Sequence, residues 1–131
     1  MSQSLKALVN KPAHTLFPMV AEYQSGGAPL FDHEHLLRYT GDDVSLQREL
    51  IALMLDQAER CLGMMGLARE RSEWRTAVHT LKGSSRGVGA FALGDLCEQA
   101  EELPEVAWPG AQLQMQQMVS ETRKAFGELA D

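Results

Sequence analysis

The sequence predicts an all-α protein: an antiparallel, up-and-down four-helix bundle preceded by one short helix. Leucine, alanine, methionine, glutamate and glutamine are plentiful, whereas aromatic residues make up only 6% of the 131 residues, a balance that favours helices over sheets. Apolar residues recur at steps of three and four, and the loops between these stretches are short. We therefore expect one bundle over residues 30–131 and an amino-terminal extension over residues 1–29.

The extension and the short helix come first along the chain. Residues 13–23 could form a short helix, and residues 25–29, which contain two glycines and a proline, are typical of a flexible joint. Asp32 is a good N-cap for a short helix through Tyr39, with Gly41 at its carboxyl end.

A long second helix is expected next, because Asp42 or Asp43 can cap it. Its apolar positions recur in helical steps at Leu46, Leu50, Leu53, Ala58, Cys61, Leu62 and Met65. Cys61 lies among apolar neighbours, as does Cys97 further on. We expect both cysteines to be reduced and packed in the core of an intracellular protein rather than joined in a disulfide.

Three further helices follow. The third is expected to start near Ser72 and to end by Gly89, which allows a sharp reversal; its apolar stripe comprises Trp74, Val78, Leu81, Ser85 and Val88. A fourth helix over residues 90–103 ends at Pro104, and residues 105–108 form a loop. Pro109 suits the first turn of a final helix, whose buried seam would comprise Ala111, Met115, Met118, Thr122, Ala125 and Leu129.

One histidine stands beside the apolar stripe of the third helix, but not on it. Positions three and four residues apart are neighbours on a helix surface, so Lys82 and Gly83 lie next to His79. Lys82 brings a positive charge to the imidazole, while Gly83, tolerated in a helix at a cost of about 1 kcal/mol, clears space for something large to approach. An exposed nucleophilic imidazole, a cation and a cleared surface together predict a phosphoryl-accepting histidine.

These residues resemble the signature of the histidine-containing phosphotransfer (HPt) domains of bacterial and plant phosphorelays. The matching positions are His79, Lys82, Gly83, Ser84, Ser85 and Gly89, and the resemblance covers roughly residues 30–130. It implies a four-helix bundle with the histidine exposed midway along one helix. The sequence departs from the commonest motif at Val78, where alanine is more usual, and at Arg86, where many relatives have small or polar residues.

A partner for the imidazole can be placed by counting. If the third and fourth helices form a hairpin that reverses near Ala90, His79 lies eleven residues before the turn and Glu101 eleven after it. A carboxylate at this height can accept a hydrogen bond from Nδ1, orient the ring and leave Nε2 facing outward. HPt domains commonly place glutamine or glutamate at this offset. Glu98, one turn away, is the alternative partner, and Glu101 could instead be an ordinary surface glutamate.

Basic side chains gather on the face of the third helix that carries the histidine. The net charge of −6 disfavours nucleic acid as a partner, yet residues 69–88 hold five basic and two acidic residues, a local excess of +3. Such a run is often only a solvated helix face. Here Arg75 and Arg86 fall four residues before and seven after His79. We expect Arg75, Ser84 and Arg86 to contact a docked receiver domain, although Ser84 could simply be solvated.

The resemblance implies a phosphorelay carrier without its own kinase activity. His79 Nε2 would accept a phosphoryl group from a receiver-domain aspartyl phosphate and pass it to a response-regulator aspartate, with Lys82 neutralising phosphoryl oxygens and Gly83 letting the receiver close in. The expected partners are receiver domains of hybrid histidine kinases and response regulators, and the carrier is expected to be a cytoplasmic monomer. Two alternatives stay open: the phospho-accepting domain of a larger sensor or chemotaxis kinase, and a helical adaptor without chemistry.

No cofactor, metal site or membrane span is expected. In residues 82–85 the lysine precedes the glycine, whereas an ATP-binding phosphate loop needs Gly-Lys-Ser/Thr. Mg²⁺ would belong to the receiver, because no carboxylate cluster resembles a Mg²⁺ site, and His33 and His35 diverge by about 200° on a helix. The apolar run over residues 16–21, broken by Pro18, is far shorter than the ~20 residues that a transmembrane helix requires.

Overall fold

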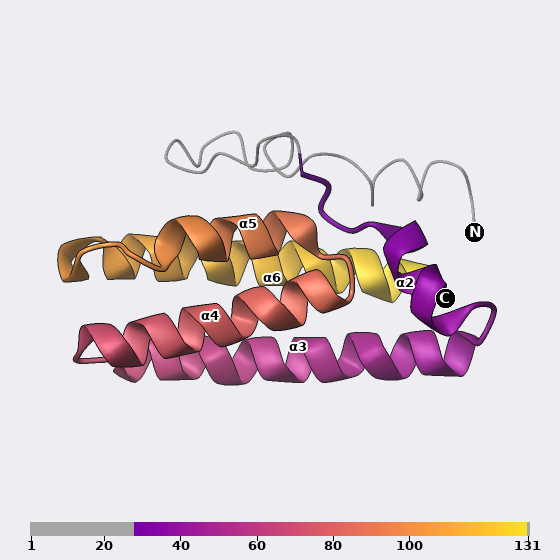
Figure 1. The fold of residues 1–131 in the computed structure, drawn as a ribbon, viewed down its shortest axis with the longest axis horizontal. Helices are drawn as coiled ribbons and strands as arrows, with labels where there is room; N and C mark the ends of the chain where they lie inside the picture. Colours follow the sequence, from indigo (N-terminus) through magenta and orange to yellow (C-terminus); the bar gives the residue numbers. More distant parts are fainter. Residues whose placement is uncertain (1–27, 131) are drawn as a thin grey trace.

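The structure, a computed structural model, describes residues 28–130, with side chains as far as residue 127, and its regular elements in this range are all helices (Figure 1). The predicted helix over residues 13–23 lies outside the described residues, as does most of the joint at residues 25–29. The elements follow the chain as α2 (His33–Thr40), α3 (Val44–Leu67), α4 (Arg71–Gly87), α5 (Phe91–Ala100), the 3₁₀ turn η2 (Glu105–Ala107) and α6 (Trp108–Ala130).

Four helices form the bundle and one short helix precedes it. α4 packs against α3 and α5, and α6 closes the ring by packing against α5 and α3. Each helix runs back alongside the one before it, while α2 lies at the end of the bundle where α3 begins (Figure 1). The predicted all-α class, with a short helix ahead of the bundle, is therefore confirmed. None of the described helices is long and apolar enough to cross a membrane.

Side-chain caps start the first two helices where the sequence suggests. The Asp32 carboxylate accepts a hydrogen bond from the His35 backbone N–H at 3.2 Å, and that of Asp43 accepts one from Leu46 at 3.0 Å. Asp43, not Asp42, is thus the N-cap of α3. Gly41, with a φ of 56°, ends α2 as predicted.

Two details of the predicted helices are wrong. Leu53 is 55% exposed, because the inward position of α3 is Met54, which is 4% exposed. The inward-facing positions of α3 run from Leu50 to Met54 and Ala58, in steps of four residues rather than three. The fourth helix ends at Ala100 rather than at residue 103.

The early end of α5 has a chemical cause. Pro104, four residues after Ala100, has no N–H with which to continue the helix. The Ala100 carbonyl instead accepts hydrogen bonds from Leu103 N–H at 3.2 Å and from the indole Nε1–H of Trp74 at 2.9 Å. The chain then makes the η2 turn within the predicted loop before α6 begins at Trp108.

Two stacked tryptophans hold this end of the bundle together. The rings of Trp74 and Trp108 are parallel within 2°, with centroids 4.9 Å apart, and both side chains are buried. Trp108 Nε1–H donates to the Leu103 carbonyl at 3.0 Å, so both indole N–H groups have acceptors. The core further along contains the free thiols Cys61 and Cys97, which were predicted to be reduced and packed there.

The α4–α5 turn depends on Gly89. Its φ of 91° lies in the left-handed region, and its carbonyl accepts the Asp32 N–H at 2.7 Å. A Cβ added at Gly89 would lie 2.6 Å from the Asp32 carbonyl oxygen. The turn therefore needs a residue without a side chain on two independent grounds.

Gly89→Ala should accordingly lower the free energy of unfolding by more than about 1 kcal/mol, from backbone strain and the contact with Asp32. Gly87→Ala is the control, because a Cβ there meets no atom within 4 Å and alanine favours a helix by up to about 1 kcal/mol. Urea unfolding followed by circular dichroism measures both. Equal stability of the two variants would contradict this account of the turn.

Candidate functional site

His79 lies on the flank of α4, beside the face that packs into the core. The buried face of the helix comprises Trp74, Ala77, Val78, Leu81 and Ser85. The His79 side chain is 72% exposed, in agreement with its position off the apolar stripe. It borders a shallow depression of about 520 Å³ that Thr76, Lys82 and Glu101 also line.

The imidazole is held by a carboxylate of the neighbouring helix. Nδ1 of His79 lies 2.7 Å from Oε1 of Glu101. An ionised carboxylate can only accept a hydrogen bond, so Nδ1 carries a proton and is the donor of this hydrogen bond. In the neutral ring, Nε2 is then the nitrogen with an available lone pair.

The same carboxylate binds a lysine. Nζ of Lys82 donates to Oε2 of Glu101 at 3.0 Å, and both side chains are largely buried, at 15% and 16% exposed. Burial of Glu101 opposes ionisation, but the hydrogen bonds from Lys82 and His79 outweigh it and hold the pKa of this carboxyl below its ordinary value. Glu101 therefore stays ionised near neutral pH and ties the imidazole to the ammonium.

Glu101 owes its position to the end of α5. It is the residue directly after the helix, and its neighbour Ala100 is anchored to α4 by the Trp74 indole. Trp74 precedes His79 by five residues on the same helix. The α4–α5 hairpin thus brings the histidine and the glutamate to the same height, as counting from Ala90 predicts.

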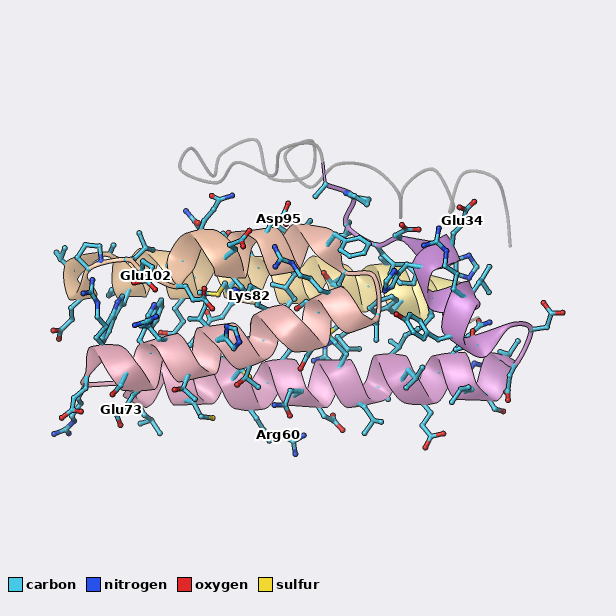
Figure 2. All side chains as sticks on the ribbon, viewed as in Figure 1. Glu34, Arg60, Glu73, Lys82, Asp95 and Glu102 are labelled. Atoms are coloured by element: carbon cyan, nitrogen blue, oxygen red, sulfur yellow. The ribbon has the colours of Figure 1, made fainter. Side chains whose placement is uncertain are left out.

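Arg75 and Arg86 of α4 also pair with acids, which lie in α5 or just after it. Arg75 lies 3.1 Å from Glu102, and Arg86 contacts Asp95 at 3.2 Å and Glu98 at 3.0 Å. Figure 2 shows Lys82 between the two helices, Asp95 along α5 and Glu102 beyond the carboxyl end of α5. Carboxylates of the same chain therefore offset much of the local positive excess.

Arg86 fits its place because α5 has a glycine opposite it. A Cβ added at Gly94 would lie 2.7 Å from Cγ of Arg86, so the glycine makes room for the arginine stem. Glu98, the alternative partner considered for the imidazole, is taken up by Arg86. The sequence analysis does not predict that these acids pair with the arginines, although Asp95, Glu98 and Glu102 recur at steps of three and four, a signal that could have revealed it.

Gly83 and Ser84 complete the set of predicted site residues. A Cβ added at Gly83 would meet no atom within 4 Å, so the surface beside Lys82 is open. Ser84 is half-buried, whereas Ser85 is fully buried and donates its hydroxyl hydrogen to the Leu81 carbonyl at 2.6 Å. The structure thus joins His79 and Lys82 through Glu101, which contacts both, and leaves Gly83 beside them.

A helical bundle that presents an exposed histidine, with Nδ1 bound to a carboxylate and a cation nearby, has the features of a phosphoryl-carrier domain. The model of the Hpt domain family matches residues 49–125, more than half of the chain. The chain belongs to this family. Hpt domains serve in histidine phosphotransfer within phosphorelays, as carriers rather than kinases, and they interact with receiver domains. A search of the curated proteins and one of the solved structures returned no match.

No metal centre stands out beside this site. Within residues 28–127, no group of three or more histidine, cysteine, aspartate or glutamate side chains is placed to hold a metal ion.

Replacing Glu101 should change how stability depends on pH. Because its pKa is lowered in the folded state, Glu101 stabilises the fold at a pH above its unfolded pKa, and this contribution is lost as the pH falls through the folded pKa. Glu101→Gln should therefore be less stable than the wild type near pH 7, and the difference should vanish in acid.

The control is Glu102→Gln, which removes an exposed pair with Arg75. It should change stability by no more than about 0.5 kcal/mol at any pH. Urea unfolding of the three proteins between pH 3 and pH 7 measures the difference. If Glu101→Gln lowers the free energy of unfolding equally at pH 3 and at pH 7, the charge of the carboxylate is not what stabilises the site.

Proposed function

We propose that this protein is a phosphorelay carrier whose His79 accepts a phosphoryl group from a receiver-domain aspartyl phosphate and delivers it to a response-regulator aspartate. The observation that carries the proposal is the 2.7 Å contact between His79 Nδ1 and Glu101 on a ring that is 72% exposed. This contact fixes the tautomer that has Nε2 as nucleophile, and exposure lets a partner reach it.

Transfer needs little covalent help from the carrier. As the bond from Nε2 to phosphorus forms, the bond between phosphorus and the receiver's aspartyl oxygen breaks, and the carboxylate leaves with the electron pair. The Nδ1 proton stays on the ring, where Glu101 accepts its hydrogen bond and stabilises the positive charge that develops on the imidazole. Delivery to the second aspartate is the same step in reverse.

Lys82 is proposed to neutralise the phosphoryl oxygens while it remains bound to Glu101. An ammonium group has three N–H donors, and one of them is directed at Oε2 of Glu101. The remaining donors can turn toward a phosphoryl group on the neighbouring imidazole, because residues three apart are neighbours on a helix. The buried ion pair also keeps the lysine stem from swinging away before the partner arrives.

The receiver is proposed to approach over Gly83, where the surface is open. Arg75 is more than half exposed, and its pair with Glu102 is screened by solvent, so it can exchange this acid for one on the partner. Ser84 is expected to contact the same partner. Arg86 already holds two acids of α5, and we expect its contact with the receiver to include them.

We also propose the partners, the oligomeric state and the cellular compartment of the carrier. The partners would be the receiver domains of hybrid histidine kinases and of response regulators, the carrier would act as a monomer, and Mg²⁺ would be bound by the receiver rather than by this chain. The free thiols Cys61 and Cys97 suit a reducing compartment, and we propose that the protein is cytoplasmic.

The direct test is phosphoryl transfer from a labelled receiver domain. Wild-type protein should acquire an acid-labile, base-stable label, and His79→Gln should acquire none while its circular dichroism stays unchanged. The control is His35→Gln, which should label normally. His35 is a half-buried histidine of α2 that packs on Phe91 of α5. Equal labelling of His79→Gln would show that another residue is the acceptor.

A second test concerns the open surface. Gly83→Leu should slow transfer at least about tenfold, since a steric cost of only about 1.4 kcal/mol in the docked complex suffices for this. Gly63→Leu is the matched control: this helical glycine also has open space around its Cβ position, but it lies in the groove between α3 and α6. Leucine favours a helix more than glycine does, so both substitutions change helix propensity alike. If Gly83→Leu and Gly63→Leu slow transfer to a similar extent, docking over Gly83 is contradicted.

A further inference from the structure

A second depression lies at the end of the bundle, between α2, α3 and α6. It has a volume of about 490 Å³ and shares no residue with the depression at His79. Its floor is the edge-to-face pair Phe31 and Phe126, with ring centroids 4.2 Å apart, and its walls include Leu36, Ile51 and Leu55. We call it the end groove. Most of its exposed lining is apolar, in contrast to the site around His79, and Gln47, Arg48 and Arg123 also border it.

The described residues leave the end groove open. Val44 at its edge is 52% exposed, and Ile51 and Leu55 are only partly buried. On the α6 wall, a Cβ added at Gly127 would meet no atom within 4 Å. Removing apolar surface of this kind from water is favourable, so an apolar segment within reach is expected to occupy the end groove.

We propose that residues 16–21 of this same chain dock in the end groove. The run reads Leu-Phe-Pro-Met-Val-Ala: five apolar side chains and one proline ring, with no polar residue. A run of six residues is too short to span a membrane, but it is long enough to fill a short apolar groove. The inference concerns a surface apart from His79 and does not rest on the proposed phosphotransfer.

The path of the chain brings this run within reach. The described chain begins at Ala28, and Phe31, three residues later, belongs to the floor of the end groove. This stretch is fixed, because the Pro29 carbonyl accepts the Ala92 N–H at 2.9 Å and Asp32 N–H donates to Gly89 at 2.7 Å. Seven residues lead from position 21 to position 28, enough to span up to about 25 Å.

The tether favours this occupant over a second copy of the protein. A segment joined to its binding surface by a short flexible linker acts at an effective concentration in the millimolar range. A second molecule at micromolar concentration would have to displace it. The sequence Ser-Gly-Gly at residues 25–27 is typical of such a linker.

The chain carries a natural reporter for this contact. Ile51 is its only isoleucine, and it lines the end groove. Selective methyl labelling of isoleucine and methionine in the full chain should show a nuclear Overhauser effect between the Ile51 δ1 methyl and one methionine methyl. That methionine signal should disappear in Met19→Leu, which identifies it as Met19.

Paired variants decide whether the run itself is responsible. Phe17→Ser with Val20→Ser should shift the Ile51 methyl signal and abolish the Overhauser effect to Met19. Leu8→Ser with Val9→Ser, an equal loss of apolar side chains outside the run, should leave both unchanged. An Ile51 signal that is the same in wild type and in the Phe17/Val20 variant would overturn the proposal.

A mixed sample separates the two possible occupants. One population of chains carries only the isoleucine label and the other only the methionine label. An Overhauser effect between Ile51 and Met19 in this mixture would assign the end groove to a second copy and overturn docking within one chain. Its absence, with the effect present in the doubly labelled protein, would establish the intramolecular contact. Phosphoryl transfer to His79 is measured separately, so failure of either proposal is recognised on its own.

Discussion

The hydrogen bond from the Trp74 indole to the Ala100 carbonyl is the contact on which the geometry of the site depends. Both groups are buried, and either one left without a partner would cost about 1–3 kcal/mol, so the contact resists sliding of α5 along α4. It ties the residue before Glu101 to the helix that carries His79. The parallel stack of Trp74 on Trp108 extends the same constraint to the start of α6.

Once this register is set, the ion pairs of α4 with residues 98–102, at and just after the end of α5, follow in order. As residue numbers rise along α4, those of the partners fall: Arg75 meets Glu102, Lys82 meets Glu101, and Arg86 meets Glu98. Such a sequence of pairs is what an antiparallel hairpin produces. Each exposed pair adds little by itself, but a shift of the hairpin by one turn would move all three basic side chains away from their present partners. The pairs therefore favour the alignment that the tryptophan enforces.

Local rules were enough to predict the exposed histidine and its carboxylate partner, whereas tertiary contacts decided the rest. Periodicity placed His79 off the buried stripe, and counting from Ala90 placed Glu101 opposite it, because both depend only on helix geometry. The exposed Leu53 was mistaken for a core residue because steps of three and four are equally helical. Pro104 shows that α5 must end nearby, but the indole that binds the Ala100 carbonyl belongs to a residue 26 positions away, and no local pattern shows that contact.

Charge balance explains why a carboxylate rather than a neutral amide can serve beside the imidazole. With a neutral ring, the Glu101 carboxylate and the Lys82 ammonium cancel, so the site presents no net charge to an incoming phosphoryl group. A lone carboxylate would repel that group, and a lone ammonium would bind it without orienting the nucleophile. As positive charge develops on the ring during the proposed transfer, the carboxylate stabilises it from Nδ1, while the ammonium faces the phosphoryl oxygens. Orientation and charge neutralisation are thus supplied by one buried pair, and water is left to be excluded by the docked receiver.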